Sequence, residues 1–426
     1  MEDEGKMKVL IFAYACDPNR QSEPGLGWNI SREIARRHEV TLVTREKNRA
    51  IFEKYLAEHP ECPHVKTKFL YHDVDGFWRK FKSKIPFGTQ LYFSRWLKTA
   101  TGKYREKIEE SDIVHQLTFC PFFVKPWGVR YTEKYVWGPI GGGGGADSRF
   151  PKGFPLRGLK YRLPEWIYRL LSWAVYSPFA IGFKRMRSKV AAITFKARAF
   201  ADEFPIAPNQ ISAVTQETGY DGNTTSRTYI GEKHPLKIVA VGRMIPHKAF
   251  EYAIRGFGKF VSDGGDGEFH IFGDGPMRKE LEALTDNISS AQPLNVRFHG
   301  NVPNAEVHAA LDSSDVFLHA SFIEAAAWSI LEAMIHGVPV VCQDRSGMAD
   351  MVTDECGTRV VGRNPAELIE AFSMALMKYY RHPELVRRHG VAGQERVRNV
   401  YTWTSVGEKI NDVYESVMGG PSLATR

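Results

Sequence analysis

The chain has 426 residues, a length that suits two or three domains rather than one. Hydrophobic residues make up 43% of it and charged residues 25%, as in an ordinary globular protein, and the lack of any run of about 18 apolar residues argues against a membrane-spanning helix. The formal net charge of +8 favours phosphate-rich small molecules or an anionic membrane face as partners, whereas the lack of a Cys/His finger, an RNP-type strand or a basic-region heptad argues against nucleic acid.

The N-terminal residues and the cysteines indicate the compartment. Residues 1–6 are acidic and contain no apolar core, so we do not expect a secretory signal peptide. The five cysteines are scattered and form no CxxC pair, so neither a disulfide framework nor a zinc site is expected. These features predict a cytoplasmic protein.

The first half of the chain begins with a βαβ pattern. An apolar strand is predicted over 9–14, a glycine-containing loop over 17–28, a helix over 29–38 and a second strand over 39–44. Short apolar runs at 113–116, 134–137 and 191–194 have the length of strands buried on both faces of a parallel sheet. We therefore expect residues 1–212 to form a Rossmann-like domain.

A second series of strands follows residues 213–235, a polar segment without clear periodicity that we interpret as a linker. The predicted strands cover 237–241, 268–272, 296–299, 316–319, 338–341 and 358–361, with helical patterns at 249–262, 277–285 and 305–311. Residues 236–400 are thus predicted to form a second Rossmann-like domain, and a helix over 406–418, within 401–426, to pack back toward the first. Two such domains form a cleft, and ligands bind at the carboxyl ends of the strands.

Two carboxylates eight residues apart give the strongest sign of chemistry. Glu324 follows a predicted strand and a short loop, and Glu332 lies within the apolar helical run that comes next. A helix that starts after a strand offers free backbone N–H groups and a positive dipole end to a diphosphate. Glu332 is placed to accept hydrogen bonds from a ribose, and Glu324 from a sugar hydroxyl. Spacing alone would fit two unrelated carboxylates equally well.

Two basic residues after the strand at 237–241 support a phosphate site. Arg243 ends that strand segment and Lys248 follows five residues later. Arg provides a planar fork and Lys a point charge for a diphosphate. After the next strand, the sequence FGDGP (272–276) predicts a tight turn, and we interpret Asp274 as a turn residue.

The order of these features resembles the C-terminal domain of retaining GT-B glycosyltransferases of family four, the glycosyl transferases group 1. The resemblance rests on VGR (241–243) with Lys248, FGDGP (272–276), FHGNV (298–302), Glu324 with Glu332, and GVPV (337–340). The opening strand, the glycine loop and residues 112–115 are similar to the N-terminal domain of that family. The resemblance implies an α/β fold of the GT-B type, with two facing Rossmann-like domains and a cleft between them.

The resemblance also implies roles for single residues: Arg243 and Lys248 would hold the donor phosphates, Glu332 the ribose and Glu324 the donor sugar. The catalytic residues that it implies are Glu324, His115, Arg243 and Lys248. The implied donor-binding residues are Gly25, Gly27, Gly242, Arg243, Lys248, Gly273, Glu324, Ala326, Ala327, Trp328, Ser329 and Glu332. The implied acceptor-binding residues are Glu23, Trp28, His115, Gly141 and Gly142. For His115 a second interpretation stays open, because a lone histidine on an apolar strand is often a hydrogen-bonded core residue.

The implied reaction is the transfer of a sugar, with retention, from a UDP- or GDP-sugar to a glycan or a lipid-linked acceptor in surface polysaccharide or glycoconjugate synthesis. The nucleoside diphosphate sugar is a co-substrate, and no cofactor is expected. Two alternatives stay open: a sugar-nucleotide epimerase of the same fold, and an inactive protein that binds nucleotide sugars.

The sequence departs from the family at two loops. The family usually has glycine directly after the first glutamate and again two residues later, whereas this chain has alanines at 325–327, and we expect their added methyl groups to crowd the donor pocket. Lys248 is followed by Ala249, where the family often has glycine.

No metal is expected, because Arg243, Lys248 and the helix dipole supply the positive charge that a leaving diphosphate needs. Asp73 and Asp75 form a lone DxD, the pattern of a different, metal-binding glycosyltransferase fold, which we interpret as unrelated to a metal site.

Three segments stay open to two interpretations each. Basic and aromatic residues alternate in 77–87 and 152–187, a composition that suits either an anionic membrane face, with the protein peripheral at the inner side of the membrane, or an ordinary core with charged surroundings. The five glycines at 141–145 suit either a mobile acceptor loop or a plain flexible turn.

Overall fold

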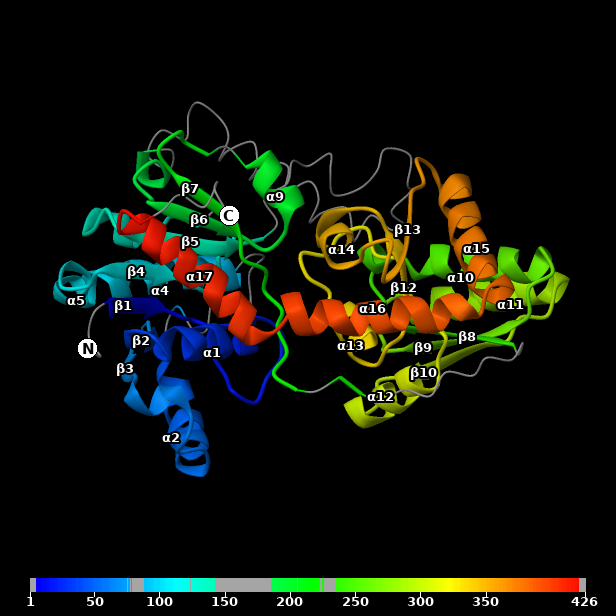
Figure 1. Ribbon diagram of the computed structural model, residues 1–426, viewed down its shortest axis with the longest axis horizontal. Coiled ribbons are helices and arrows are strands. Elements are labelled where there is room, and N and C mark those ends of the chain that lie inside the picture. Colours follow the sequence, from blue (N-terminus) through cyan, green and yellow to red (C-terminus); the bar gives the residue numbers. More distant parts are fainter. Residues whose placement is uncertain are drawn as a thin grey trace. The chain divides into compact units, whose positions relative to one another are not determined.

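The computed structural model describes residues 5–74, 76, 78, 88–122, 124–141, 185–204, 206–222, 224–225 and 235–420. The chain divides into two compact units (Figure 1). Of the described residues, the first unit contains 5–141, 185–219 and 403–420, and the second contains those from 220 to 402. The first unit is therefore assembled from both the early and the last part of the chain.

The first unit is built on a parallel sheet of seven strands in the order β3-β2-β1-β4-β5-β6-β7. The strands are β1 (Lys8–Phe12), β2 (Glu39–Thr44), β3 (Lys68–Tyr71), β4 (Ile113–Gln116), β5 (Tyr135–Ile140), β6 (Ala192–Phe195) and β7 (Ile211–Val214). In register, Val9 of β1 lies opposite Val40 of β2 and Ile113 of β4. The central strands β4, β5 and β6 are buried along their whole length, because parallel sheets are covered on both faces.

Helices cover both faces of this sheet. They are α1 (Ser22–Ala35), α2 (Arg49–Glu58), α4 (Gly88–Lys103), α5 (Arg105–Glu109), α9 (Arg198–Glu203) and α17 (Trp403–Val417), with 3-10 turns η1 (Glu46–Asn48), η2 (Pro63–Lys66) and η3 (Trp127–Arg130). The last helix, α17, drawn in red in Figure 1, packs on α1 and β7. Its contacts include His38 Nε2 with Asn411 Oδ1 at 3.2 Å, so a residue near the C-terminal end helps to hold the first unit together.

Helix α1 begins at Ser22, seven residues before the predicted start at Asn29. Pro24 is tolerated there, because the first-turn N–H groups of a helix have no intrahelical acceptor. A methyl group on Gly25 would lie 2.2 Å from Arg20 O, and one on Gly27 would lie 2.1 Å from Ala15 O. Both glycines therefore let the helix lie against the backbone of the preceding loop. The proline and glycines that led us to predict a loop are thus part of a closely packed helix.

The second unit has a parallel sheet of six strands in the order β10-β9-β8-β11-β12-β13. The strands are β8 (Leu236–Val241), β9 (Gly267–Phe272), β10 (Val296–Gly300), β11 (Val316–His319), β12 (Val340–Gln343) and β13 (Gly357–Val360). Strand β12 begins two residues later than predicted, after Pro339, which has no N–H for the sheet but whose carbonyl oxygen accepts the N–H of Phe317 at 3.0 Å. Strand β7 of the first unit reaches into the segment 213–235 that we interpreted as a linker.

Two layers of helices enclose the second sheet. The helices are α10 (Phe250–Ser262), α11 (Arg278–Ala291), α12 (Asn304–Asp312), α13 (Trp328–Ile335), α14 (Ser346–Met351), α15 (Pro365–Arg381) and α16 (Glu384–Val400), with the 3-10 turn η4 (Pro246–Lys248). One face of the sheet packs with α10, α11, α15 and the start of α16, and the other with α12, α13, α14 and the later part of α16. Alternate residues of β8 serve the two cores: Ile238 and Ala240 face the first, and Val239 the second.

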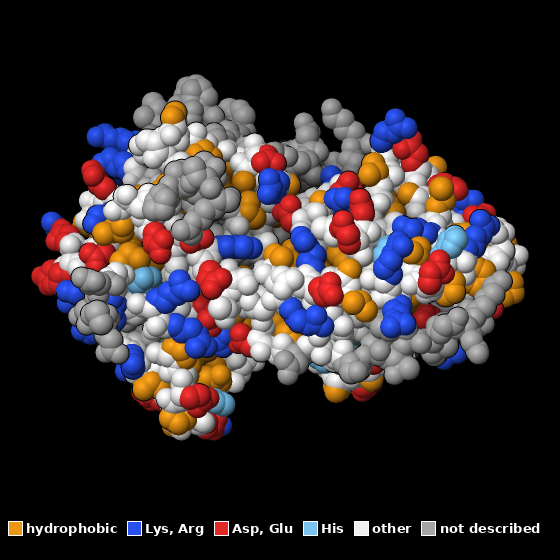
Figure 2. Space-filling model, viewed as in Figure 1, with side chains coloured by type: hydrophobic (Ala, Val, Ile, Leu, Met, Phe, Trp, Pro, Cys, Tyr) orange, Lys and Arg blue, Asp and Glu red, His pale blue; other side chains and the backbone are white. Residues whose placement is uncertain are grey.

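The surface of the described residues is mixed in charge. Basic and acidic side chains lie interspersed on the face shown in Figure 2. Among the helices that the structure describes, none is both long and apolar enough to cross a lipid bilayer.

Candidate functional site

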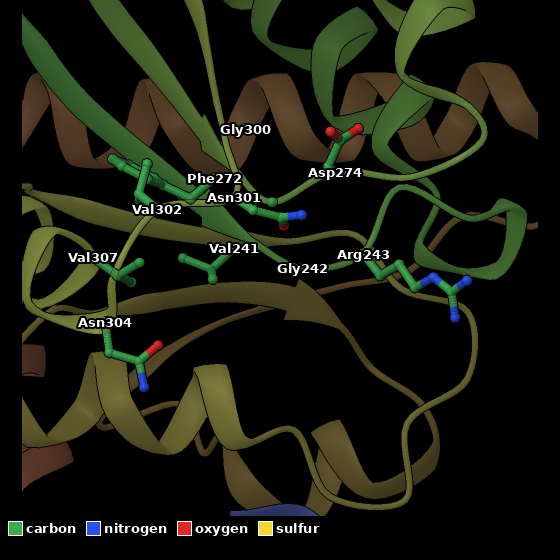
Figure 3. Close-up of a pocket in the computed structure, with 11 residues that line it drawn as sticks. Val241, Gly242, Arg243, Phe272, Asp274, Gly300, Asn301, Val302, Asn304 and Val307 are labelled. Carbon is green, nitrogen blue, oxygen red and sulfur yellow. The ribbon is translucent and has the colours of Figure 1, made fainter.

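A pocket of about 410 Å³ lies at the carboxyl ends of β8, β9 and β10 (Figure 3). It is lined by Val241, Gly242, Arg243, Phe272, Gly273, Asp274, Gly300, Asn301, Val302, Asn304 and Val307. Valines, a phenylalanine and two asparagine amides give it apolar walls with a few polar groups, as in pockets for small ligands. Its position at the strand ends is where doubly wound sheets bind their ligands.

Tight backbone turns shape this pocket. Gly273 has φ +110°, and a methyl group on it would lie 2.2 Å from Gly242 O. The N–H of Gly242 donates to Phe272 O at 3.0 Å, and that of Gly273 to Gly300 O at 2.8 Å. Asp274 accepts the N–H of Gly275 at 2.6 Å, as expected for the turn residue that we predicted. Three strand ends are thus joined by backbone hydrogen bonds, and glycine is needed where they approach most closely.

The two predicted phosphate-binding cations lie in the loop after β8. Arg243 is exposed, and in Figure 3 its side chain extends away from Val241 and Val307. Lys248 ends η4, and its side chain is 19% exposed. Ala249 follows in the left-handed conformation, with φ +54°, before α10 begins. That conformation favours glycine, which is the residue that the family often has at this position.

The loop after β11 brings Glu324 to Lys248. The hydroxyl of Ser321 donates to His247 O at 3.0 Å, and the N–H of Phe322 donates to the same oxygen at 2.8 Å. These bonds tie the loop to η4, and the ammonium group of Lys248 forms an ion pair with the Glu324 carboxylate. The carbonyl of Glu324 accepts the N–H of Gly347 at 2.7 Å, so α14 supports the loop from its other side.

Helix α13 starts directly after this loop. Trp328 and Ser329 form its first turn, where backbone N–H groups lack intrahelical acceptors and the helix dipole is positive. Glu332 lies on the same helix and is half-buried. Ala327 is only 3% exposed within an apolar core that Ala326 also contacts. These two methyl groups therefore pack against the core of this domain.

Two histidines near the ion pair carry no charge at neutral pH. Burial, followed by the charges of Lys248 and Arg243, lowers the pKa of His247 to about 4. Burial and the nearby Lys248 likewise hold the pKa of His319 well below its usual range. The positive charge of the site therefore comes from Arg243 and Lys248.

The comparison with known families agrees with this arrangement. Residues 235–378 match the family described as Glycosyl transferases group 1. They are a glycosyl transferases group 1 domain. The pocket and the Lys248–Glu324 ion pair both lie within this group 1 domain.

Curated relatives match over about half of their own length. The chain is 23% identical over 219 residues to the phosphatidylinositol N-acetylglucosaminyltransferase GPI3 subunit of Saccharomyces cerevisiae, covering 51% of this chain and 46% of the relative. It is 30% identical over 200 residues to a GDP-mannose-dependent alpha-mannosyltransferase of Mycolicibacterium smegmatis, covering 46% of this chain and 47% of the relative.

Solved structures confirm the predicted fold. Sucrose-phosphate synthase from Thermosynechococcus elongatus superposes with a TM-score of 0.60 at 14% identity, covering 97% of this chain and all of that one. Anabaena HepE in complex with UDP gives a TM-score of 0.57 at 14% identity, covering 96% of this chain and all of that one. The α/β GT-B fold that the sequence predicted is thus shown for this chain.

Outside the group 1 domain, Glu23 belongs to a charged cluster in the first unit. Its carboxylate accepts the N–H of Phe119 at 2.6 Å and pairs with Lys196 at 2.8 Å, and Lys196 also pairs with Glu217. Burial alone would lower the pKa of Lys196, but Glu217 and Glu23 raise it above its usual range. Sequence reasoning missed Lys196 and Glu217, although each is a charged residue one to three positions beyond a strand end, which is a usable signal.

Strained backbone surrounds this cluster. Three non-glycine residues here have positive φ: Ser22 (61°), Phe119 (54°) and Gln216 (62°). Ser22 precedes Glu23 and Gln216 precedes Glu217 in sequence, and the N–H of Phe119 donates to Glu23. Non-glycine residues with positive φ are uncommon and gather at functional sites. The cluster lies at the carboxyl ends of the first sheet, where ligands of such sheets bind.

Two predicted acceptor residues are core residues in this structure, which corrects those expectations. Trp28 is 1% exposed and packs against Phe52, Tyr55 and His64. His115 is fully buried, with Nδ1 2.6 Å from the Tyr414 hydroxyl and Nε2 2.9 Å from Gly138 O. Burial lowers its pKa to about 4. Of the two interpretations of His115, the structure thus supports the hydrogen-bonded core residue.

The remaining predicted features lie partly or wholly outside the described residues. Gly141 is described: it bridges to Pro121, and a methyl group on it would lie 2.8 Å from Lys196 Cδ. Gly142 and the rest of the glycine run lie outside the described residues, as do Asp75 and most of the basic aromatic stretches 77–87 and 152–187. Across the residues that are described, no three His, Cys, Asp or Glu side chains gather in the manner of metal ligands.

Proposed function

We propose that this protein is a glycosyltransferase that moves a hexose-type sugar from a UDP- or GDP-sugar to a glycan or a lipid-linked acceptor. The observation that carries the proposal is the Lys248–Glu324 ion pair, placed beside a strand-end pocket within a group 1 domain. Its relatives support a sugar nucleotide donor, since one is a GDP-mannose-dependent enzyme and one structure of the same fold was solved with UDP. Surface polysaccharide or glycoconjugate synthesis is the setting that we propose.

In this proposal the donor extends from the pocket to the ion pair. The pocket of 410 Å³ takes the nucleoside, and Glu332 on α13 binds its ribose. Arg243, Lys248 and the first turn of α13 hold the diphosphate, because each places positive charge or N–H donors beside it. Glu324 accepts a hydroxyl of the donor sugar.

The proposed reaction needs electrostatic stabilisation rather than a bound metal or a cofactor. Negative charge grows on the leaving diphosphate as the bond to the sugar breaks, and Arg243 and Lys248 stabilise that charge. We propose retention of the anomeric configuration, and we propose the Glu23–Lys196–Glu217 cluster of the first unit as a binding site for the acceptor. Gly25 and Gly27 would contribute to ligand binding only indirectly, because their close packing fixes the position of the neighbouring backbone.

A thermal-shift panel of UDP-, GDP- and ADP-sugars tests donor binding, because a ligand that binds only the folded state stabilises it. With the donor so identified, Arg243→Ala and Lys248→Ala should each weaken its nucleoside diphosphate about tenfold or more, since a charge-assisted hydrogen bond is lost. Calorimetry measures the dissociation constants. Lys279→Ala, an exposed lysine on α11, is the control and should leave affinity unchanged.

The outcomes separate the proposal from its alternatives. Unchanged affinity in both Arg243→Ala and Lys248→Ala would exclude the proposed phosphate site. Conversion of the donor to a second sugar nucleotide without any acceptor would indicate an epimerase. Binding without release of sugar to any acceptor would indicate an inactive binding protein.

We also propose an anionic membrane surface as a partner, on a surface of the first unit. Lys98 Nζ, Lys125 Nζ and Arg130 Cζ lie 5.0, 5.7 and 4.6 Å from the centre of the Trp127 ring. Leu91, 52% exposed, lies on the Lys98 side of α4. Cations around a tryptophan, next to an exposed leucine, suit the interface of an anionic bilayer.

Vesicle flotation tests this surface. The protein should float with vesicles that contain phosphatidylglycerol and less with pure phosphatidylcholine, and Lys98→Glu with Arg130→Glu should abolish the difference. Lys54→Glu with Lys66→Glu, on another part of the same unit, changes the net charge equally and should leave binding intact. Equal flotation of both double variants would contradict the proposal.

A further inference from the structure

One oxygen of Glu324 faces three potential hydrogen-bond donors. Oε1 pairs with Lys248 Nζ and lies 3.4 Å from the Ser321 hydroxyl oxygen, whose proton goes to His247 O at 3.0 Å. The same oxygen lies 3.8 Å from His319 Nε2. That distance is too long for a hydrogen bond, so His319 faces the carboxylate without bonding to it.

His319 is an unusual neighbour for this carboxylate. It ends β11, it is only 4% exposed, and its Nε2 has no hydrogen-bond partner within the part of the chain that the structure describes. Buried polar atoms without a partner are rare, and such an atom beside a candidate site calls for an explanation. The His319 ring stacks on that of Phe317, with the ring centroids 6.0 Å apart. An apolar residue would fill this place without burying a polar atom that lacks a partner.

Binding of a donor would alter the surroundings of Glu324. Lys248 is the cation nearest to its carboxylate, and it is also a proposed partner of the donor diphosphate. A diphosphate at Lys248 draws on the same ammonium group and brings negative charge toward the carboxylate, and like charges at short range repel. The carboxylate then needs another donor to stay in place for the sugar.

We propose that His319 is a positioning residue, which donates its Nε2–H to Glu324 when the donor diphosphate engages Lys248. A shift of Glu324 by about 1 Å turns the 3.8 Å approach into a hydrogen bond of ordinary length. The neutral imidazole adds no charge that would compete for the phosphate, and it holds the carboxylate toward the sugar hydroxyl. The inference rests on the proposed function and adds a residue to its sugar subsite.

The test compares nucleotides with and without the sugar. UDP is paired with UDP-glucose and GDP with GDP-mannose, and dissociation constants are measured by calorimetry for the full chain. His319→Phe should leave the affinity for UDP or GDP unchanged, because the diphosphate does not contact His319. The same variant should bind the sugar nucleotide about tenfold more weakly than the unaltered protein does, as expected for the loss of one hydrogen bond to a charged group.

A conservative variant separates positioning from folding. His319→Gln keeps an N–H donor and should restore most of the lost affinity for the sugar nucleotide, whereas a purely structural role would not depend on that donor. A second readout is the slow release of free sugar from the same donor in the absence of acceptor, which should fall in His319→Phe and recover in His319→Gln.

Each outcome decides between the claims. Equal loss of UDP and UDP-glucose binding in His319→Phe, or no loss of either, overturns the role of His319 while leaving the proposed function intact. Failure of the unaltered protein to bind either nucleotide pair overturns the proposed function, and this inference with it. Loss confined to the sugar nucleotide, with recovery in His319→Gln, supports both.

Discussion

At the scale of single residues, two left-handed positions shape the loops of the group 1 domain. Gly273 has φ +110° and lies against the backbone of Gly242. Ala249 has φ +54° and directly follows Lys248, so the position of that cation depends on a conformation that alanine adopts at some cost. The departure from the family's glycine, noted in the sequence, thus falls at a residue where glycine would be the less strained choice.

Gly273→Ala should lower the free energy of unfolding more than Gly264→Ala does. Both glycines have positive φ, but a methyl group on Gly264 meets nothing within 4 Å, whereas one on Gly273 would lie 2.2 Å from Gly242 O. The conformational cost alone is about 1–2 kcal/mol, and the clash should add about 1–3 kcal/mol. Denaturant unfolding followed by circular dichroism measures both, and equal losses would show that the close approach is not rigid.

At the scale of elements, most strands were predicted close to their observed bounds, whereas β3 and β7 were not predicted. Short apolar runs bounded by turns marked β2 and β11 at their observed bounds, because strands buried on both faces leave little room for polar residues. Helix α1 was predicted to start too late, since Pro24, Gly25 and Gly27 have the composition of a loop. These residues are accommodated in a helix because the preceding loop packs closely against them, and local sequence does not reveal that packing.

The candidate site was predictable to a similar degree. Lys248 and Glu324 were singled out from local motifs, and the structure brings them into contact across 76 residues. Lys196 and Glu217 were missed, because the ion pairs of Lys196 with Glu23 and Glu217 depend on the order of strands in the sheet. His115 and Trp28 were assigned to the acceptor from the family resemblance, although the apolar strand around His115 also allowed the buried core residue that the structure shows.

At the scale of the whole molecule, several histidines are buried in neutral form. Burial lowers the pKa of His64 to about 3 and that of His115 to about 4. Both are in the first unit, and His319, whose pKa is also lowered by burial, is in the second. In the unfolded chain each of these side chains would titrate near its ordinary value of about 6.5.

Stability should therefore fall as the pH decreases from about 6.5 toward 4. Over that range the unfolded chain binds protons that the folded protein does not, so unfolding becomes more favourable; above that range these histidines contribute no pH dependence. Each pH unit between the two pKa values of a group corresponds to about 1.4 kcal/mol. Denaturant midpoints at pH 7.5, 6.0 and 5.0 measure the trend, and midpoints that stay level would show that other groups compensate.

Helix α17 gives the chain an unusual order of assembly during synthesis. A ribosome makes residues 220–402 in one continuous stretch, so the group 1 domain and its flanking helices can fold as they emerge. The first unit, although it is made first, must wait for residues 403–417, which supply Asn411 for His38 and Tyr414 for His115. Until then the surface that α17 covers on α1 and β7 is open to chaperones or to wrong partners. The earliest part of the chain is thus the last to be completed.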